Sequence, residues 1–307
     1  MTGSTPVLGL LNPVGVLFLI GLYGGGVLLI RETTVRWKAG WIPVLLLGGA
    51  YGIAEEGLGT KTFFDAALIH NPFPGPWGHF LGVNWAWAVQ LGIFHAVFSI
   101  ALPILLISLA FPSTVGRPFL TVRGTRAVGV VFGITVAAMF FLFDARYALS
   151  PALVVGSLAA MALLALAAYR WPAGWLQPVT PSSDASLRAF LAVGALFVWG
   201  FFTINWLLAS ATLNTPLVVG LQLVLAAAVL LWIVRHVGVD HPGPAQVRLA
   251  VGLLSFLLVL ATVLDFTGDW GAVVPAALLS YFLFRLARSH PGPASVLRQG
   301  PLPSGSA

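Results

Sequence analysis

Long apolar segments run through the whole chain and restrict it to folds that a membrane can hold. About nine are present, each of about 17 residues or more, which lets a helix cross about 30 Å of hydrocarbon. Only 8% of the residues are charged, whereas a soluble domain carries about 25%. We therefore expect an all-α fold, a polytopic bundle of about nine transmembrane helices. The segments are approximately 9–30, 41–62, 82–110, 127–143, 151–169, 189–209, 216–234, 248–264 and 270–285.

The basic residues occupy alternate loops between these segments. Of the 15 Lys and Arg, two (Lys61 and Arg146) fall in one alternating set of loops and the others fall in the second set. Cytoplasmic loops are enriched in Lys and Arg, so this pattern predicts an outer N-terminus and a cytoplasmic C-terminus. The net charge of +6 then reflects topology signals, and we expect no nucleic-acid partner.

The domain organisation is simple, because no polar stretch is long enough to fold by itself. We expect one transmembrane helical domain over residues 1–290 and a disordered cytoplasmic tail over 291–307, which is rich in Pro, Gly and Ser. The first apolar run has no basic stretch before it, which argues against a cleaved signal peptide. We expect a multi-pass protein of the cell membrane with membrane lipid as a partner.

Glu55 and Glu56 are ionisable residues inside an apolar segment. With a helix that begins near Trp41, they lie about 21 Å from the inner boundary, where an unpaired carboxylate costs about 3 kcal/mol. Adjacent carboxylates repel, so one of them is expected to hold a proton, as general acid–base catalysis or proton coupling requires. A structural salt bridge to Lys61 or Arg31 is the alternative.

Two glycines precede the pair on the same helical stripe. Gly48 and Gly52 lie four residues apart, and Glu56 follows four residues later. Small residues let a second helix approach closely, so we expect Glu56 to face the bundle rather than lipid.

The third apolar segment carries polar residues at helical spacing. Asn84, Ala88, Leu91, His95 and Ser99 share one predicted helical face, which runs from the outer interface to the middle of the membrane. An isolated ionisable group in hydrocarbon is costly, so we expect the Glu pair and His95 to share one polar cavity open toward the outer leaflet. The expected catalytic residues are Glu55, Glu56 and His95, and the expected substrate-binding residues are Asn84, Gln90, Ser99 and Asn205.

Several other kinds of site are excluded by missing patterns. The chain has no cysteine, which rules out thiolate metal sites, and it has no HExxH, GxSxG or P-loop pattern. We expect no cofactor. A single His with two Glu could supply part of a metal site, so metal binding stays open.

A local pattern resembles a known family. The sequence AEEGLGTKTFF, followed about forty residues later by FHAVFS, resembles the CAAX-protease and bacteriocin-processing (CPBP) superfamily over about fifty residues. The resemblance implies that Glu55 or Glu56 activates water and that His95 positions it or stabilises the oxyanion. Thr60 stands where that family has Arg, and Asn205 is the later intramembrane amide that could replace a later family histidine.

Two functions fit these observations. The first is an intramembrane hydrolase that cleaves a peptide or lipid bond. The alternative is a proton- or cation-coupled transporter of a small solute, in which the carboxyl pair exchanges protons or binds the cargo.

Overall fold

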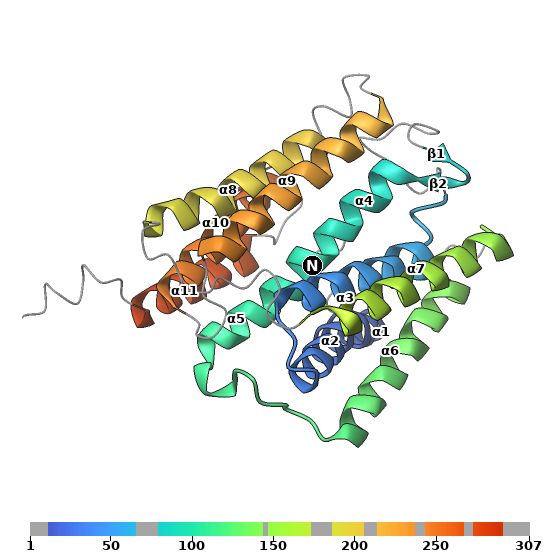
Figure 1. The fold of residues 1–307 in the computed structure, drawn as a ribbon, viewed down its shortest axis with the longest axis horizontal. Coiled ribbons are helices and arrows are strands. Elements are labelled where there is room, and N and C mark those ends of the chain that lie inside the picture. Colours follow the sequence, from blue (N-terminus) through green and yellow to red (C-terminus); the bar gives the residue numbers. More distant parts are fainter. Residues whose placement is uncertain are drawn as a thin grey trace, which may run out of the picture.

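The protein is an all-α helical bundle (Figure 1). The computed structural model describes residues 12–65, 79–143, 147–172, 186–205, 214–236, 243–266 and 273–290. Within these ranges there are nine helices, which confirms the expected fold class. Their positions follow the nine apolar segments of the sequence. The expected tail, 291–307, lies outside the described residues.

The first three helices each contain a π-helical segment. The first consists of α1 (Pro13–Leu19), η2 (Ile20–Gly24) and α2 (Gly25–Arg36). The second consists of α3 (Trp41–Gly52) and η3 (Ile53–Gly59). The third consists of α4 (Trp85–Phe94), η4 (His95–Ala101) and α5 (Leu102–Ala110), and a short antiparallel hairpin, β1 (His79–Phe80) with β2 (Val83–Asn84), leads into it.

The remaining helices are regular. They are α6 (Val122–Leu142), α7 (Pro151–Arg170), α8 (Leu187–Thr203), α9 (Thr215–His236), α10 (Pro244–Phe266) and α11 (Val273–Ser289), and a 3₁₀ turn, η5 (Pro112–Thr114), follows α5. Among the described residues, six helices are long and apolar enough to cross a bilayer. These spans are Pro13–Arg36, Trp85–Ala110, Val122–Leu142, Pro151–Arg170, Thr215–His236 and Pro244–Val263.

The sequence marks several helix starts with capping side chains. Thr121, Ser150 and Ser186 each accept a hydrogen bond from a backbone N–H in the first turn of the helix that follows. Such a side chain satisfies one of the four N–H groups that a helix start leaves unpaired. Pro151 then occupies the first turn of α7, where no N–H is needed.

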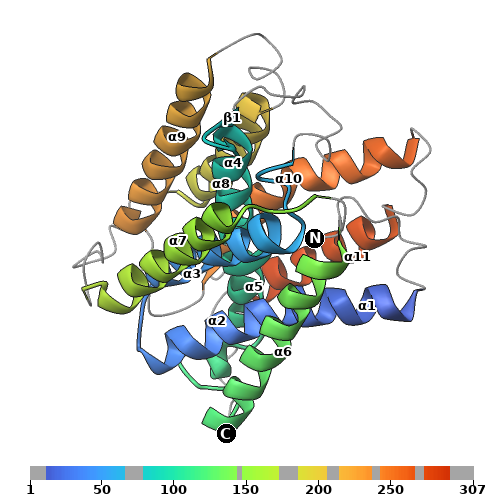
Figure 2. The same ribbon diagram turned by 90° about the vertical axis from the view of Figure 1, so that its right-hand side faces the viewer.

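The helices form two groups around the α4–α5 helix. Helices α8 to α11 lie on one side of it, and α1, α2, α3, α6 and α7 lie on the other (Figure 1). Helix α7 runs alongside α3 in both views (Figure 2). The α4–α5 helix contacts α3 in the second group and α9 and α10 in the first, so it joins the two groups.

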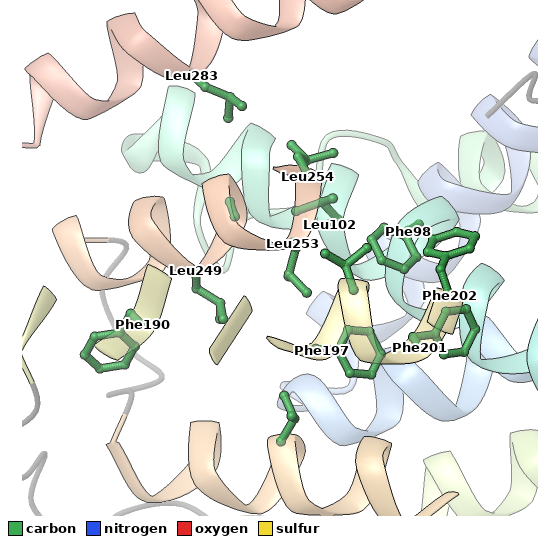
Figure 3. Close-up of a cluster of buried hydrophobic side chains, with 13 residues drawn as sticks. Phe98, Leu102, Phe190, Phe197, Phe201, Phe202, Leu249, Leu253, Leu254 and Leu283 are labelled. Carbon is green, nitrogen blue, oxygen red and sulfur yellow. The ribbon is translucent and has the colours of Figure 1, made fainter. Parts of the chain in front are cut away.

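A cluster of 13 buried apolar side chains fills the side of the bundle that contains α8 to α11 (Figure 3). Phe98 and Leu102 from the α4–α5 helix pack there against Phe197 and Phe201 of α8. Because lipid tails are as apolar as these side chains, close packing rather than exclusion of water is what holds such helices together.

Helices α8 and α10 meet at a pair of glycines. A Cβ atom placed on Gly194 would overlap backbone atoms of α10, and one placed on Gly252 would overlap backbone atoms of α8. The two backbones approach this closely because neither residue has a side chain, as in other small-residue contacts between membrane helices.

A buried acid fixes the segment that follows α5 against α2. Glu32 has no exposed surface, and its carboxylate accepts hydrogen bonds from the backbone N–H groups of Phe119 (2.8 Å) and Leu120 (3.1 Å). Arg31 pairs with Glu32 at 2.9 Å, and its guanidinium carbon lies 3.4 Å from the centroid of the Phe119 ring. Each charge in this group therefore has a partner, as buried charges require.

Candidate functional site

The expected polar residues come together where the three π-helical segments meet. Glu55 and Glu56 lie in η3, His95 begins η4, and Tyr23 lies in η2. A π-helical turn is rare in proteins and is frequently found at functional sites. Within the described part of the chain, these turns place side chains from three separate helices at one point.

Two glycines allow the Glu helix to reach the His helix. A Cβ atom on Gly48 would lie 2.7 Å from the Cα of Ala96, and one on Gly52 would lie 3.3 Å from the Cβ of His95. The prediction that this stripe faces the bundle is therefore confirmed. The close approach is what brings Glu56 within reach of His95.

His95 lies between two carboxylates. Its Nε2 is 3.3 Å from Glu56 Oε1, and its Nδ1 is 3.3 Å from Glu55 Oε2. Ser99 Oγ lies 2.9 Å from the same Nδ1, one helical turn further along. His95 is 2% exposed, so these side chains, rather than water, are the hydrogen-bond partners of its ring.

Hydroxyl groups hold the far oxygen of each carboxylate. Tyr23 donates a hydrogen bond to Glu55 Oε1 at 2.5 Å. Thr60 and Thr62 donate to Glu56 Oε2 at 2.9 Å and 2.5 Å. In both glutamates the other oxygen faces His95. The hydroxyl groups therefore fix the orientation of each carboxylate relative to the imidazole.

The two glutamates differ in their surroundings. Glu55 is buried, and among the described residues its Oε2 has an ion-pair contact with His95 but no hydrogen bond. The Glu56 side chain is 16% exposed, compared with 5% for Glu55. Glu56 is therefore the more accessible of the two carboxylates.

The arrangement can move a proton. If Ser99 donates to Nδ1, then Nε2 carries the ring proton and donates it to Glu56. If Nδ1 carries the proton instead, Nε2 can accept one from Glu56. The imidazole therefore connects Ser99 and Glu55 on one side to Glu56 on the other, as a general acid–base group must.

The alternative, a salt bridge between the Glu pair and Arg31, is not present among the described residues. Arg31 pairs with Glu32 and donates to the backbone oxygens of Thr114 and Arg117. Lys61 directs its Nζ to the backbone oxygens of Phe143 (3.3 Å) and Tyr147 (3.2 Å). The reason for the difference is distance along the helices, because Arg31 lies near the end of α2 that meets the start of α3, whereas the glutamates follow the end of α3.

The expected substrate-binding residues divide into two sets. Ser99 contacts His95, whereas Asn84 caps α4 by accepting a hydrogen bond from the Trp87 N–H (3.1 Å). Asn84 therefore lies in β2, before the helix begins, and the expected continuous helical face starts after it. Gln90 is buried on α4.

Asn205 makes its contacts at the other side of α4. It hydrogen-bonds to Gln222 and donates to the Phe201 backbone oxygen (2.7 Å). Gln222 is fully buried and also donates to the Ala86 backbone oxygen (3.4 Å), more than two helical turns before His95. Among the described residues, the hydrogen bonds of Asn205 are thus with Gln222 and Phe201 and not with the glutamates. Whether these residues bind substrate remains a prediction.

Sequence reasoning missed Tyr23, Thr62 and Gln222. Tyr23 lies in an apolar run beside several glycines, and a buried hydroxyl in such a run needs a partner, which is a usable signal. Thr60 and Thr62 follow Glu56 by four and six residues, and only the turn at the end of η3 brings Thr62 back to Glu56. Thr60 holds Glu56 through its hydroxyl.

The same three side chains could hold a metal ion. Glu55, Glu56 and His95 each offer one ligand atom, and these atoms all lie within 4.8 Å of one another. Imidazole nitrogen and carboxylate oxygen are ligands that Zn²⁺ accepts. The geometry is therefore compatible with metal binding, which the sequence had left open.

Comparison with known proteins identifies the family. The chain belongs to an uncharacterized membrane protein family, whose model matches residues 1–287. No curated protein and no solved structure matches the chain. Together with the six apolar spans, the family assignment shows a multi-pass membrane protein.

Proposed function

We propose that this protein is a hydrolase of the cell membrane, similar to CPBP proteins, that cleaves a peptide or ester bond of a substrate held in the bilayer. One observation carries the proposal: the His95 imidazole lies between Glu55 and Glu56, with a nitrogen–oxygen distance of 3.3 Å on each side. A carboxylate and an imidazole in hydrogen-bond contact are the groups that general acid–base hydrolysis needs.

Glu56 is the proposed base, because it is the more exposed of the two glutamates and is held by two threonine hydroxyls. It takes a proton from water, and the resulting hydroxide attacks the substrate carbonyl carbon. The proton then passes from Glu56 to the leaving group when the bond breaks. His95 donates from Nε2 to Glu56 or to the oxyanion, and Ser99 fixes its ring.

Glu55 has a supporting role in this scheme. Its carboxylate is buried, accepts a hydrogen bond from Tyr23, and faces the Nδ1 side of the imidazole. A negative charge there stabilises a doubly protonated imidazole, as the buried Asp does in a Ser-His-Asp triad. Positioning and charge stabilisation, rather than proton abstraction, are therefore assigned to Glu55.

A specific feature also favours the second candidate, a proton-coupled transporter. Both nitrogens of His95 face a carboxylate, so a proton taken up by one glutamate can pass through the ring to the other. Chains of Glu and His within the membrane are typical of proton relays in transporters.

The two candidates are separated by the Glu56→Gln variant in proteoliposomes. Gln keeps the shape of Glu but cannot accept the proton, so the hydrolase should lose about 10²- to 10⁴-fold in its rate of cleavage. Quenched fluorescent peptides and lipid esters reconstituted with the protein supply the readout. A transporter would show no cleavage at all, and the wild type alone would move protons when solute is added.

A histidine pair provides the matched control. His95→Gln should lose cleavage, whereas His236→Gln, on α9 with its Nδ1 bound to the Trp232 backbone oxygen, should keep it. Equal cleavage by wild type and His95→Gln would contradict the hydrolase proposal. The melting temperature of each variant shows whether a loss of rate comes from unfolding.

A further inference from the structure

A cavity lies away from the glutamates, at the end of the bundle where α3 begins. Its volume is about 580 Å³, and its wall is formed by α3, the η4–α5 region and α9, with the end of α7 and the start of α10. Trp41 and Ile42 at the start of α3 line it, whereas Glu55 and Glu56 follow the end of the same helix. The lining also includes Ala96 and Val97, which follow His95 in the sequence.

The wall of this cavity is apolar along its length. Leu45, Val97, Leu105, Ala226 and Leu230 are among the residues that face into it, and no acidic side chain is among the described residues that line it. Pockets of this size are typical of sites that enclose a small molecule. An apolar ligand fits this lining.

One part of the lining, formed by the segment before α3 and by the end of α7, has the composition of a membrane interface. Trp37, Trp41 and Trp171 line it, together with Tyr169, whose ring lies 5.2 Å from that of Trp37. Trp and Tyr are enriched where hydrocarbon meets the polar headgroups. We therefore take this part of the lining as the mouth of the cavity, placed at headgroup level, where the head of a lipid would be found.

One basic residue lines the cavity, and three more lie next to lining residues in the sequence. Lys38 lines the cavity and is exposed. Arg170, Arg235 and Arg248 are also exposed, and each adjoins a lining residue at the end of α7, at the end of α9 or at the start of α10. All four belong to the set of loops that the charge distribution predicts to be cytoplasmic. Basic pockets between transmembrane helices on that side bind the heads of anionic lipids.

We propose that this cavity binds one anionic phospholipid, with an acyl chain between α3 and α9 and with its phosphate at Lys38. The apolar wall matches the chain, the aromatic mouth matches the interface, and the basic residues match the charge of the head. This site is separate from the glutamate–histidine group. The proposal does not depend on hydrolysis, and its test reads out lipid binding rather than cleavage.

The first experiment measures thermal stabilisation of the purified full chain by added lipid. Phosphatidylglycerol should raise the melting temperature more than phosphatidylcholine does, because a ligand that binds the folded state stabilises it. Lys38→Gln should weaken phosphatidylglycerol binding about fivefold, which corresponds to one Lys at a membrane surface. The same change should leave the small effect of phosphatidylcholine as it is.

A matched pair on α9 tests the position of the chain. Ala226 lines the cavity, whereas Ala228 is exposed and is not part of its wall. Ala226→Trp should fill the space and abolish the difference between the two lipids, and Ala228→Trp should retain it. If both variants keep the full difference, the lipid does not occupy this cavity and the proposal is wrong.

A measurement on the wild type avoids any folding defect in the variants. Phosphatidylglycerol with a photoreactive acyl chain should label peptides from α9 and from the start of α3. Labelling confined to the outward faces of α6 and α7, or equal stabilisation by both lipids, would overturn the proposal. Loss of cleavage with intact lipid binding, or the reverse, would separate this site from the proposed active site.

Discussion

Replacing Gly48 with Ala tests how tightly the site depends on the contact between α3 and η4. The added Cβ would lie 2.7 Å from the Cα of Ala96, whereas ordinary contact begins near 3.4 Å, so the helices must separate by about 0.7 Å. Overpacking of this kind costs about 1–3 kcal/mol. Ala is favoured over Gly in a helix by about 1 kcal/mol, so the expected net loss of stability is about 1 kcal/mol.

The same shift should reach the functional group. The distance from His95 Nε2 to Glu56 Oε1 is 3.3 Å, which is already long for a hydrogen bond, and a further separation by that amount breaks it. We therefore expect Gly48→Ala to lower the cleavage rate as well as the melting temperature. Unfolding in detergent, followed by circular dichroism, measures the stability.

The neighbouring glycine is the control. A Cβ on Gly49 would meet Leu164 Cδ1 at 3.6 Å, which is an ordinary contact. Gly49→Ala should therefore be neutral or stabilising by up to about 1 kcal/mol, from helix propensity alone. If Gly48→Ala matches or exceeds the stability of Gly49→Ala, then the close approach of α3 to η4 is not a constraint and the reasoning fails.

Four further outcomes are expected. Tyr23→Phe should destabilise the protein by about 1–3 kcal/mol, because Glu55 loses its hydroxyl donor, and an unchanged melting temperature would contradict this. Gly252→Ala should be strongly destabilising, since its Cβ meets the backbone of α8, whereas Gly220→Ala, with open space around it, should not be; equal melting curves would refute the α8–α10 contact. Glu32→Gln should increase amide hydrogen exchange at residues 119 and 120, and unaltered exchange there would show that the carboxylate does not hold this segment. A reporter fused to the C-terminus should be cytoplasmic, and its detection outside would reverse the topology predicted from the charges.

Much of the fold could be predicted because its determinants are local. A run of apolar residues long enough to cross the bilayer can only be a helix in a chain of this class, so each segment could be placed from sequence alone. The approach of Glu56 to His95 could also be anticipated, since Gly48 and Gly52 indicate a close neighbour and a buried carboxylate needs a partner. What the sequence could not show was that each ring nitrogen of His95 faces a different carboxylate.

The details of the site depended on features without a local signal. Sequence reasoning assumed regular α-helical spacing, whereas both Glu55 and His95 lie in π-helical segments. The contact between Tyr23 and Glu55 joins residues from different helices, and nothing in the spacing of either helix indicates it. Asn84 was expected on the helical face, but an Asn before an apolar helix is also a preferred N-cap, and this local role is the one it has.

The π-helical segments have a consequence for how the helices can vary. A regular helix turns by about 100° per residue, so one additional residue accommodated in a wider turn leaves the parts before and after it out of phase by that angle. Helix α4 packs on α9, and α5 packs on α10. The η4 turn that carries His95 lies between α4 and α5, so it determines the angle between these two packing faces. Deleting one residue between His95 and Ala101 would restore a continuous α-helix and rotate one of those faces away from its neighbour. The position of His95 and the alignment of the two helix groups therefore both depend on η4. A deletion or insertion in η4 would change both together.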